Sequence, residues 1–428
     1  MDWYTLLFTA CVLLLVVVPD VGRSNSSGAE TFELSKGVNA LLLRFASGEL
    51  LLFSCYAFMY GGVAAGITLA MAMGAAVFVL WRSITARRHL LVSEGEYWLD
   101  CCFTVRALTF FRFFACLLSI GRLLAVLALC AYLLRHLFHV PQLFLFLWFS
   151  YVYVFTVLAG WTGMRKVGTV LLYMVYLVAG IIPFAYYLTG GVMRYYETVA
   201  RTAPSLLDID TASLFVLFSS VLATAAGQWM ADPYVWEIAP RMKRERVAMA
   251  VFIAACCLIP LPLAMVALCI PYAAAASPEA IWKGWLLHSS AWMSWPLAMA
   301  LLAAMSCSLS LSLRSVVQLF EAKWSGQSSW IYVLSFLAVF LLLWIVPLLP
   351  MWGVIFSTAL LASTCFGMAA WRAEEKRMGV MIIIGWSCLL VFTWRWGVRH
   401  HELEAIAWNG IGSFVFARTY QFIQKIKK

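Results

Sequence analysis

Long apolar runs separated by short polar stretches dominate the chain, and most are longer than a buried helix of a soluble protein needs. About 20 consecutive apolar residues cross the hydrocarbon layer of a bilayer, and about eleven runs of this kind follow residue 49. They predict spans at residues 50–81, 107–134, 141–160, 167–189, 212–230, 247–274, 285–313, 330–346, 351–371, 378–398 and 403–423. The predicted fold class is therefore an all-α, multi-pass membrane helix bundle.

The composition agrees with this pattern. The 428-residue chain is 64% hydrophobic and 12% charged, whereas a soluble domain is about half apolar and a quarter charged. We attribute its net charge of +10 to basic loops on one membrane face, so a nucleic-acid partner is not expected. Its 12 cysteines lie mostly inside apolar runs, and no zinc, phosphate-loop or serine-hydrolase motif occurs. We therefore expect neither an enzyme nor a metal centre.

The N-terminal region has its own pattern. Residues 3–18 form a short apolar run that ends at Pro19 and Asp20, which predicts a signal peptide over residues 1–22, with a signal anchor as the alternative. Residues 23–49 are then an extracellular or luminal segment, in which Asn25 begins a glycosylation sequon. Residues 50–428 form the transmembrane domain.

Basic residues are concentrated in alternate loops between the predicted spans. Because cytoplasmic loops of membrane proteins carry the excess of Lys and Arg, this alternation places the C-terminus in the cytosol. With the spans counted as above, the mature N-terminus lies outside, in the plasma membrane or an endomembrane.

Charged residues inside predicted spans are the first candidates for function. Arg122 lies near the middle of span 107–134, and Asp232 ends span 212–230 next to Pro233, which lacks a backbone donor. Together with Trp229 and Tyr234, these residues are candidates for the wall of a substrate cavity. Two alternatives stay open: a structural ion pair for Arg122, and an ordinary helix end with interfacial aromatic residues for Asp232.

The span 285–313 carries an unusual set of hydroxyl groups. Ser306, Ser308, Ser310 and Ser312 occur there together with Cys307. Small polar residues allow close packing of membrane helices, and hydroxyl and carbonyl oxygens can also bind a hard cation such as Na⁺. The spacing alone does not decide between the two interpretations.

Four stretches in order resemble the solute:sodium symporter family, nearest its urea-active-transporter branch. They are SEGEYWLDCC (93–102), VYVFTVLAGWTGMRKVGTVLLYMVYLV (152–178), QWMADPYVWEIAP (228–240) and AAMSCSLSLSLRSVVQLFEAKW (303–324). The resemblance implies a leucine-transporter-like fold of two inverted repeats with discontinuous helices at the midplane. If span 107–134 is the first core helix, two core helices have no counterpart, and the fold is a truncated version.

The resemblance also implies an ion site on span 285–313, at Ala304, Cys307 and Ser308. Cys307 stands where the family has a hydroxyl, and sulfur is a poor ligand for a hard cation. Arg122 lies in the helix paired with the first core helix, and we expect it to pack toward Ser308 and Cys307. The sequence therefore predicts a weak sodium site and no other cofactor.

Two functions from different classes follow. The first is a divergent secondary transporter that moves a small polar solute, such as urea, a polyamine or an amino-acid-like compound, across the lipid bilayer. The second is a non-transporting sensor or structural membrane subunit that keeps the transporter fold. The motifs in their expected order favour the first function, and the substituted ion site favours the second.

Overall fold

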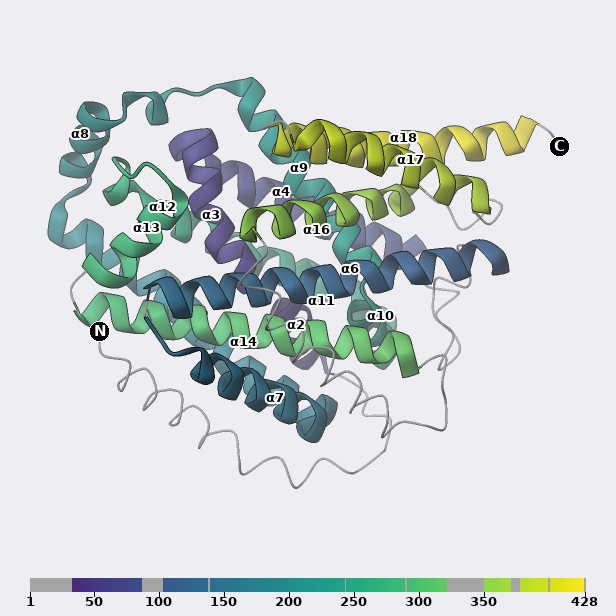
Figure 1. Ribbon diagram of the computed structural model, residues 1–428, viewed down its shortest axis with the longest axis horizontal. Coiled ribbons are helices and arrows are strands. Elements are labelled where there is room, and N and C mark those ends of the chain that lie inside the picture. Colours follow the sequence, from purple (N-terminus) through teal and green to yellow (C-terminus); the bar gives the residue numbers. More distant parts are fainter. Residues whose placement is uncertain are drawn as a thin grey trace.

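The computed structural model describes residues 33–86, 103–137, 139–242, 244–288, 291–321, 350–370, 378–398 and 401–426. Every named element in these ranges is a helix (Figure 1). Eight helical stretches in the described part are long and apolar enough to cross a membrane, which confirms a multi-pass, all-α membrane protein. The predicted signal peptide, the sequon at Asn25 and the span 330–346 lie outside these ranges.

Most predicted spans correspond to observed helices. Those that agree closely are α6 (Val105–Tyr132), α9 (Thr211–Ala231), α14 (Ala291–Glu321), α16 (Met351–Cys365), α17 (Val380–Gly397) and α18 (Glu402–Ile426). The predicted span 247–274 is divided into α11 (Arg244–Leu258) and α12 (Pro260–Cys269). Proline lacks the backbone donor that would continue the helix, which accounts for a division in front of Pro260.

The predicted span 50–81 is wrong, because the chain reverses within it. Residues 34–49, counted above with the extramembrane segment, form α2 (Leu34–Phe45) and the start of α3 (Gly48–Gly61). A short 3₁₀ turn (Gly62–Ala64) then leads to α4 (Ala65–Ala86).

Contacts with α9 show this reversal. Phe45 stacks on Trp229 near the end of α9, with ring centroids 4.2 Å apart, whereas Gly61 packs against Leu214 near its beginning. The helix α3 is therefore antiparallel to α9. The helix α4 starts beside the beginning of α9 and packs along it, so it returns in the opposite direction.

The helix α7 (Gln142–Gly190) covers both predicted spans 141–160 and 167–189. A straight helix of 49 residues would be about 74 Å long, more than twice the thickness of the hydrocarbon layer. Its two ends nevertheless lie close together. Tyr187 donates to the carbonyl of Ala267, and Trp285 donates to the carbonyl of Leu268, both at 2.9 Å.

A second set of contacts shows that the start of α7 lies near the same residues as its end. The amide of Val140 donates to the carbonyl of Leu134 at 2.9 Å, and Tyr132 lies edge-on to Trp282. Because Trp282 is three residues from Trp285, α7 must fold back on itself. Its two halves correspond to the two predicted spans.

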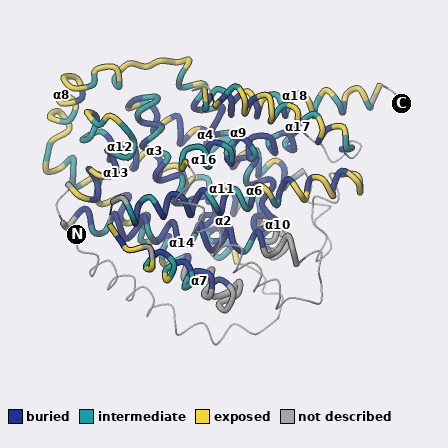
Figure 2. The backbone as a smooth tube through the Cα atoms, viewed as in Figure 1, coloured by how far each residue is buried: buried dark blue, intermediate teal, exposed yellow. Residues whose placement is uncertain are grey.

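Short helices connect the long ones. They are α8 (Val192–Thr202), α10 (Pro233–Arg241), α13 (Pro278–Lys283), 3₁₀ turns at Pro204–Leu207, Ile270–Tyr272 and Phe366–Ala370, and π turns at Leu133–Leu137 and Gly284–His288. In Figure 2 burial is highest in the middle of the bundle, around α14 and α2, whereas α8 and much of α18 are exposed. Of the eight candidate spans, α14 is the most buried.

Both described ends of the chain lie at one end of the bundle. Gly227 of α9 packs against the backbone of Phe366. The end of α16 therefore lies beside Trp229 and Phe45. Arg418 of α18 donates to the carbonyl of Ala370 at 3.1 Å. We call this the basic end, since the helix turns that lie toward it contain Lys36, Arg82, Arg106, Arg246, Arg314 and Arg418. The opposite end, which we call the acidic end, contains Gly62, Asp210, Glu402 and Glu404, together with the basic residues Arg194, Arg201 and Lys283 of α8 and α13.

This arrangement differs from the predicted topology at residue 33, the first described residue. Residues 33 and 426 share one end of the bundle, whereas the predicted spans place residue 33 and the C-terminus on opposite sides. The cause is the turn at Gly62, which adds one crossing. The same turn moves Lys36 to the basic end and so strengthens the charge asymmetry.

Candidate functional site

The first element of the site is the break between α2 and α3. Ser47 is extended at the start of α3, and its hydroxyl accepts from the amide of Leu50. The amide of Gly48, the residue after Ser47, donates to Ser308 Oγ of α14 at 3.0 Å. The hydroxyl of Ser308, which was expected at an ion site, therefore binds a backbone amide at the break between α2 and α3.

The position of this break corrects the family pairing. Span 107–134 was expected to be the first core helix, but α6 is continuous and the interrupted helix comes earlier. The inference that two core helices are missing rested on that pairing and is withdrawn with it. The sequence ahead of α6 already supplies α2, α3 and α4.

The second element is the predicted break at Asp232, which is confirmed. The helix α9 ends at Ala231, Asp232 is extended, and α10 starts at Pro233. Asp232 Oδ1 accepts from the amide of Tyr234 at 3.1 Å and so caps α10. The carboxylate is buried, with 4% of its residue surface exposed.

Asp232 is the centre of a buried ion cluster that joins four helices. Arg44 Nε of α2 bonds to Asp232 Oδ2, and Arg122 Nη1 of α6 lies 3.8 Å from the same oxygen. Ser315 of α14 donates to Asp232 Oδ1 at 2.9 Å. Because a buried charge is costly unless it is paired and hydrogen-bonded, this set of donors explains how a carboxylate is held here.

Arg122 connects this cluster to the break in the first helix. Its Nε lies 3.4 Å from Glu49 Oε1, one residue after Gly48. The Gln228 amide, oriented with its oxygen toward Arg122, accepts from Nε and Nη1 at 2.9 Å each. The two guanidinium groups of Arg44 and Arg122 are thus balanced by the carboxylates of Glu49 and Asp232.

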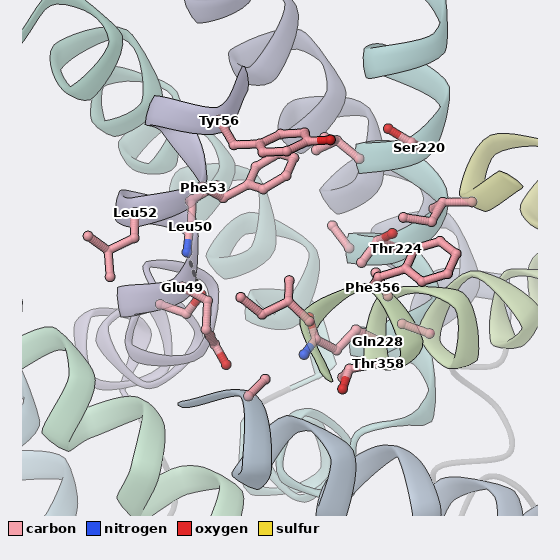
Figure 3. Close-up of a pocket in the computed structure, with 18 of the residues that line it drawn as sticks. Glu49, Leu50, Leu52, Phe53, Tyr56, Ser220, Thr224, Gln228, Phe356 and Thr358 are labelled. Atoms are coloured by element: carbon pink, nitrogen blue, oxygen red, sulfur yellow. Dashed lines mark hydrogen bonds between the residues drawn. The ribbon is translucent and has the colours of Figure 1, made fainter. Parts of the chain in front are cut away.

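A cavity of about 170 Å³ lies between α3, α6, α9, α16 and the start of α18. Figure 3 shows Phe53 and Tyr56 reaching from α3 toward Ser220 and Thr224 of α9. The polar residues that line the cavity are Ser47, Glu49, Arg122, Ser220, Thr224, Gln228, Thr358 and Glu402. A mostly apolar cavity with few convergent polar groups is typical of a small-molecule site.

Aromatic rings form a continuous wall on one side of this cavity. Phe53 stacks on Tyr56 at 5.6 Å, Tyr56 lies 5.3 Å from Trp352, and Trp352 lies 6.0 Å from Trp282, all between ring centroids. Trp352 donates its indole N–H to Glu279 Oε1 at 2.5 Å. Hydrogen bonding and ring packing hold this wall in place.

The predicted site residues have different positions relative to the cavity. Arg122 and Trp229 line it, whereas Asp232 and Tyr234 lie behind Arg122, in the ion cluster and at the start of α10. Tyr234 also donates to the carbonyl of Ala40 of α2.

The predicted ion-site residues Ala304, Cys307 and Ser308 lie on α14, outside the set that lines the cavity. The partners of Arg122 in the described part are Glu49, Gln228 and Asp232, in place of the expected Ser308 and Cys307. Within the described residues, no group of three His, Cys, Asp or Glu side chains is suited to holding a metal.

Sequence reasoning missed Arg44, Gln228, Ser315 and the cavity face of α3. A signal for that face was present, because Glu49, Phe53, Tyr56 and Tyr60 recur at intervals of three and four residues. They therefore share one side of a helix. The signal was lost because residues 50–81 were interpreted as one apolar span that begins after Glu49.

Comparison with known proteins finds solved structures with a similar fold. Neither a protein-family model nor a curated protein sequence matches the chain. Among solved structures, a substrate-bound, outward-open Na⁺-coupled sialic acid symporter is similar over 98% of this chain and 96% of its own, with a TM-score of 0.72 and 17% identity.

Two further structures are similar over most of both chains. Mhp1, a nucleobase-cation-symport-1 family transporter in a closed conformation with bromovinylhydantoin bound, has a TM-score of 0.55 and 13% identity, over 93% and 94% of the two chains. A manganese transporter of Eremococcus coleocola has a TM-score of 0.53 and 11% identity, over 90% and 94%. The protein therefore has the leucine-transporter-like fold that was predicted.

Proposed function

We propose that the protein is a secondary transporter that carries a small polar solute through the central cavity. The observation that supports this proposal best is the position of the cavity beside two interrupted helices. Helix interruptions expose backbone groups and allow a site to open to one side and then to the other. Here the breaks at Ser47 and Asp232 are joined by Arg122, which also lines the cavity.

Uptake into proteoliposomes tests this function. We expect the purified protein to accumulate at least one solute from a panel of labelled urea, putrescine, choline and neutral amino acids, at a rate that saturates with concentration. Arg122→Met, which removes the group between the two breaks, should reduce that uptake at least tenfold. Glu197→Gln changes an exposed charge on α8 and should not alter it.

The alternative, a sensor or structural subunit with the same fold, predicts a different result in the same preparation. Solutes would then shift the thermal unfolding midpoint of the protein without any uptake above that of empty liposomes. Binding without transport would contradict the proposed function.

We propose further that transport does not depend on sodium. Ser308 Oγ already accepts from the amide of Gly48, and Cys307 offers sulfur where the related family has a hydroxyl. The four charges around the breaks are balanced among themselves. Uptake should be equal in sodium and potassium chloride, and a sodium-driven increase of tenfold or more would contradict this.

The orientation is also proposed. The basic end of the bundle, with both described chain ends, faces the cytosol, because it carries most of the Arg and Lys residues. The acidic end then faces the outside or an organelle lumen.

A further inference from the structure

We infer that the solute is a small organic monocation whose charged group binds at Glu49 against the aromatic wall of Phe53, Tyr56 and Trp352. This inference rests on the proposed function and names the chemical class of the solute. Four features of the cavity support it: the exposure of Glu49, the number of carboxylates in the lining, the aromatic rings, and the partners that Arg122 keeps when a ligand binds.

Glu49 is the accessible member of the ion pair at the cavity. Its side chain is 21% exposed, whereas that of Arg122 is only 3% exposed. Arg122 already has three acceptors, Glu49, Gln228 and Asp232, so its donors are directed into protein. A ligand that enters the cavity therefore meets the carboxylate more readily than the guanidinium.

Negative charge exceeds positive charge at the cavity. The charged residues that line the cavity are two carboxylates, Glu49 and Glu402, and one guanidinium group, Arg122. Glu402 lies within hydrogen-bonding range of the Tyr56 hydroxyl. The lining thus favours a cation over an anion.

The acidic surroundings continue outward from Tyr56. One turn along α3, Tyr60 is close to Glu404 and Asp210. Hydrogen bonds from the Ser213 hydroxyl and the Ala212 amide lower the pKa of Asp210, so it is ionised at neutral pH. His401 lies 3.5 Å from Glu404 and offsets it only when protonated. In a chain with a net charge of +10, these carboxylates place negative charge next to Tyr60, one turn from the cavity, and so favour cations there.

The aromatic wall suits an ammonium group that carries hydrocarbon. A cation within about 6 Å of a ring centroid is attracted to the face of Trp, Tyr or Phe. Phe53, Tyr56 and Trp352 are adjacent rings in the cavity lining, and Phe53 and Tyr56 follow Glu49 on the same face of α3. The volume of about 170 Å³ limits the ligand to a compact molecule.

Binding of a cation at Glu49 leaves Arg122 with its other partners. The Gln228 oxygen and Asp232 Oδ2 remain within 2.9 Å and 3.8 Å of the guanidinium, so no buried charge is stranded. The ligand replaces Arg122 at Glu49, so Arg44 and Arg122 then share the carboxylate of Asp232, with the Gln228 oxygen as a further acceptor for Arg122.

The test compares three ligands of nearly equal shape on the purified full-length protein in detergent. Choline carries the positive charge, 3,3-dimethylbutan-1-ol is its neutral carbon isostere, and 3,3-dimethylbutyrate carries a negative charge. Quenching of tryptophan fluorescence reports binding without any need for transport. We expect choline to bind at least tenfold more tightly than either of the others.

Two sets of variants locate the site. Glu49→Gln should weaken choline binding at least tenfold and leave the weak binding of the neutral isostere unchanged, whereas Glu197→Gln, an exposed charge change on α8, should alter neither. Trp352→Phe, which keeps a ring, should retain most of the affinity, and Trp352→Leu should lose it. The second set keeps the inference testable if Glu49→Gln does not fold.

The outcomes separate this inference from the proposed function. Equal or tighter binding of the neutral or anionic isostere, or unchanged choline binding in both Glu49→Gln and Trp352→Leu, overturns the inference even if some neutral solute is transported. Specific choline binding at Glu49 without uptake of any solute supports the inference about the site and overturns the transporter proposal.

Discussion

Asp232 shows how a single buried carboxylate can organise a membrane protein. It forms ion pairs with Arg44 and Arg122 and accepts hydrogen bonds from Ser315 and the amide of Tyr234. These four partners come from four different helices. In a low-dielectric interior each of these charges alone is costly, and together they are tolerated. The cluster therefore holds the two helix breaks in register with each other.

Asp232→Asn should destabilise the fold strongly, since it leaves Arg44 without its carboxylate in the protein interior. Breaking a buried ion pair from one side costs about 3–5 kcal/mol. We expect a clear fall in the thermal unfolding midpoint of the detergent-solubilised protein.

The control for this prediction is Glu197→Gln. Glu197 pairs with Arg201 on the exposed surface of α8, and such pairs contribute less than about 1 kcal/mol. The double variant Arg44→Met, Asp232→Asn should recover part of the loss because it removes both charges. Equal midpoints for Asp232→Asn and Glu197→Gln would show that the cluster does not stabilise the fold.

Cys307→Ser tests the ion-site interpretation at the level of one atom. It introduces the hydroxyl that the resemblance to solute:sodium symporters implies beside Ser308, whose Oγ accepts from the amide of Gly48. We expect uptake by the variant to remain equal in sodium and potassium. Sodium-dependent uptake created by this one oxygen would show that the remaining ligands were already in place.

At the scale of the elements, the turn between α3 and α4 decides the course of the first third of the chain. Gly62 has φ +62°, a conformation that disfavours any residue with a Cβ. A Cβ built on Gly62 would lie 2.1 Å from the carbonyl oxygen of Leu206. Conformation and close packing thus both require glycine at the reversal.

Gly62→Ala should therefore lower the thermal midpoint and the yield of folded protein, because the turn must shift to relieve the contact with Leu206. The matched control is Gly180→Ala. A Cβ at Gly180 meets nothing within 4 Å on the exposed side of α7, and alanine favours a helix by about 1 kcal/mol over glycine. A similar loss in both variants would argue against a special role for the turn.

At the scale of the whole molecule, the two described ends of the chain share one face of the bundle. That arrangement predicts that Glu33→Cys and Lys428→Cys react with a membrane-impermeant thiol reagent from the same side, the cytosol. Arg201→Cys, next to the acidic end, should react only from the opposite side. The unmodified protein gives the background from native cysteines, such as exposed Cys256. Labelling of Glu33→Cys and Lys428→Cys from opposite sides would refute the reversal at Gly62.

Apolar length and period by themselves determined the class of this protein and most of its helices, because a bilayer requires long runs of apolar side chains with satisfied backbone. The break at Asp232 was also predictable, since Pro233 removes a donor wherever it occurs. Arg122 stood out for the same local reason, as a charge in an apolar run.

Only the tertiary structure decided the reversal at Gly62, the break at Ser47 and the partners of Arg122. Each depends on residues far away in the sequence: Leu206 against Gly62, Ser308 on the amide of Gly48, and Asp232 beside Arg44. An apolar run looks the same whether it crosses a membrane once or turns back on itself, because lipid and protein interior favour the same side chains. Packing between distant helices distinguishes the two, and that information is not contained in any single stretch of the chain.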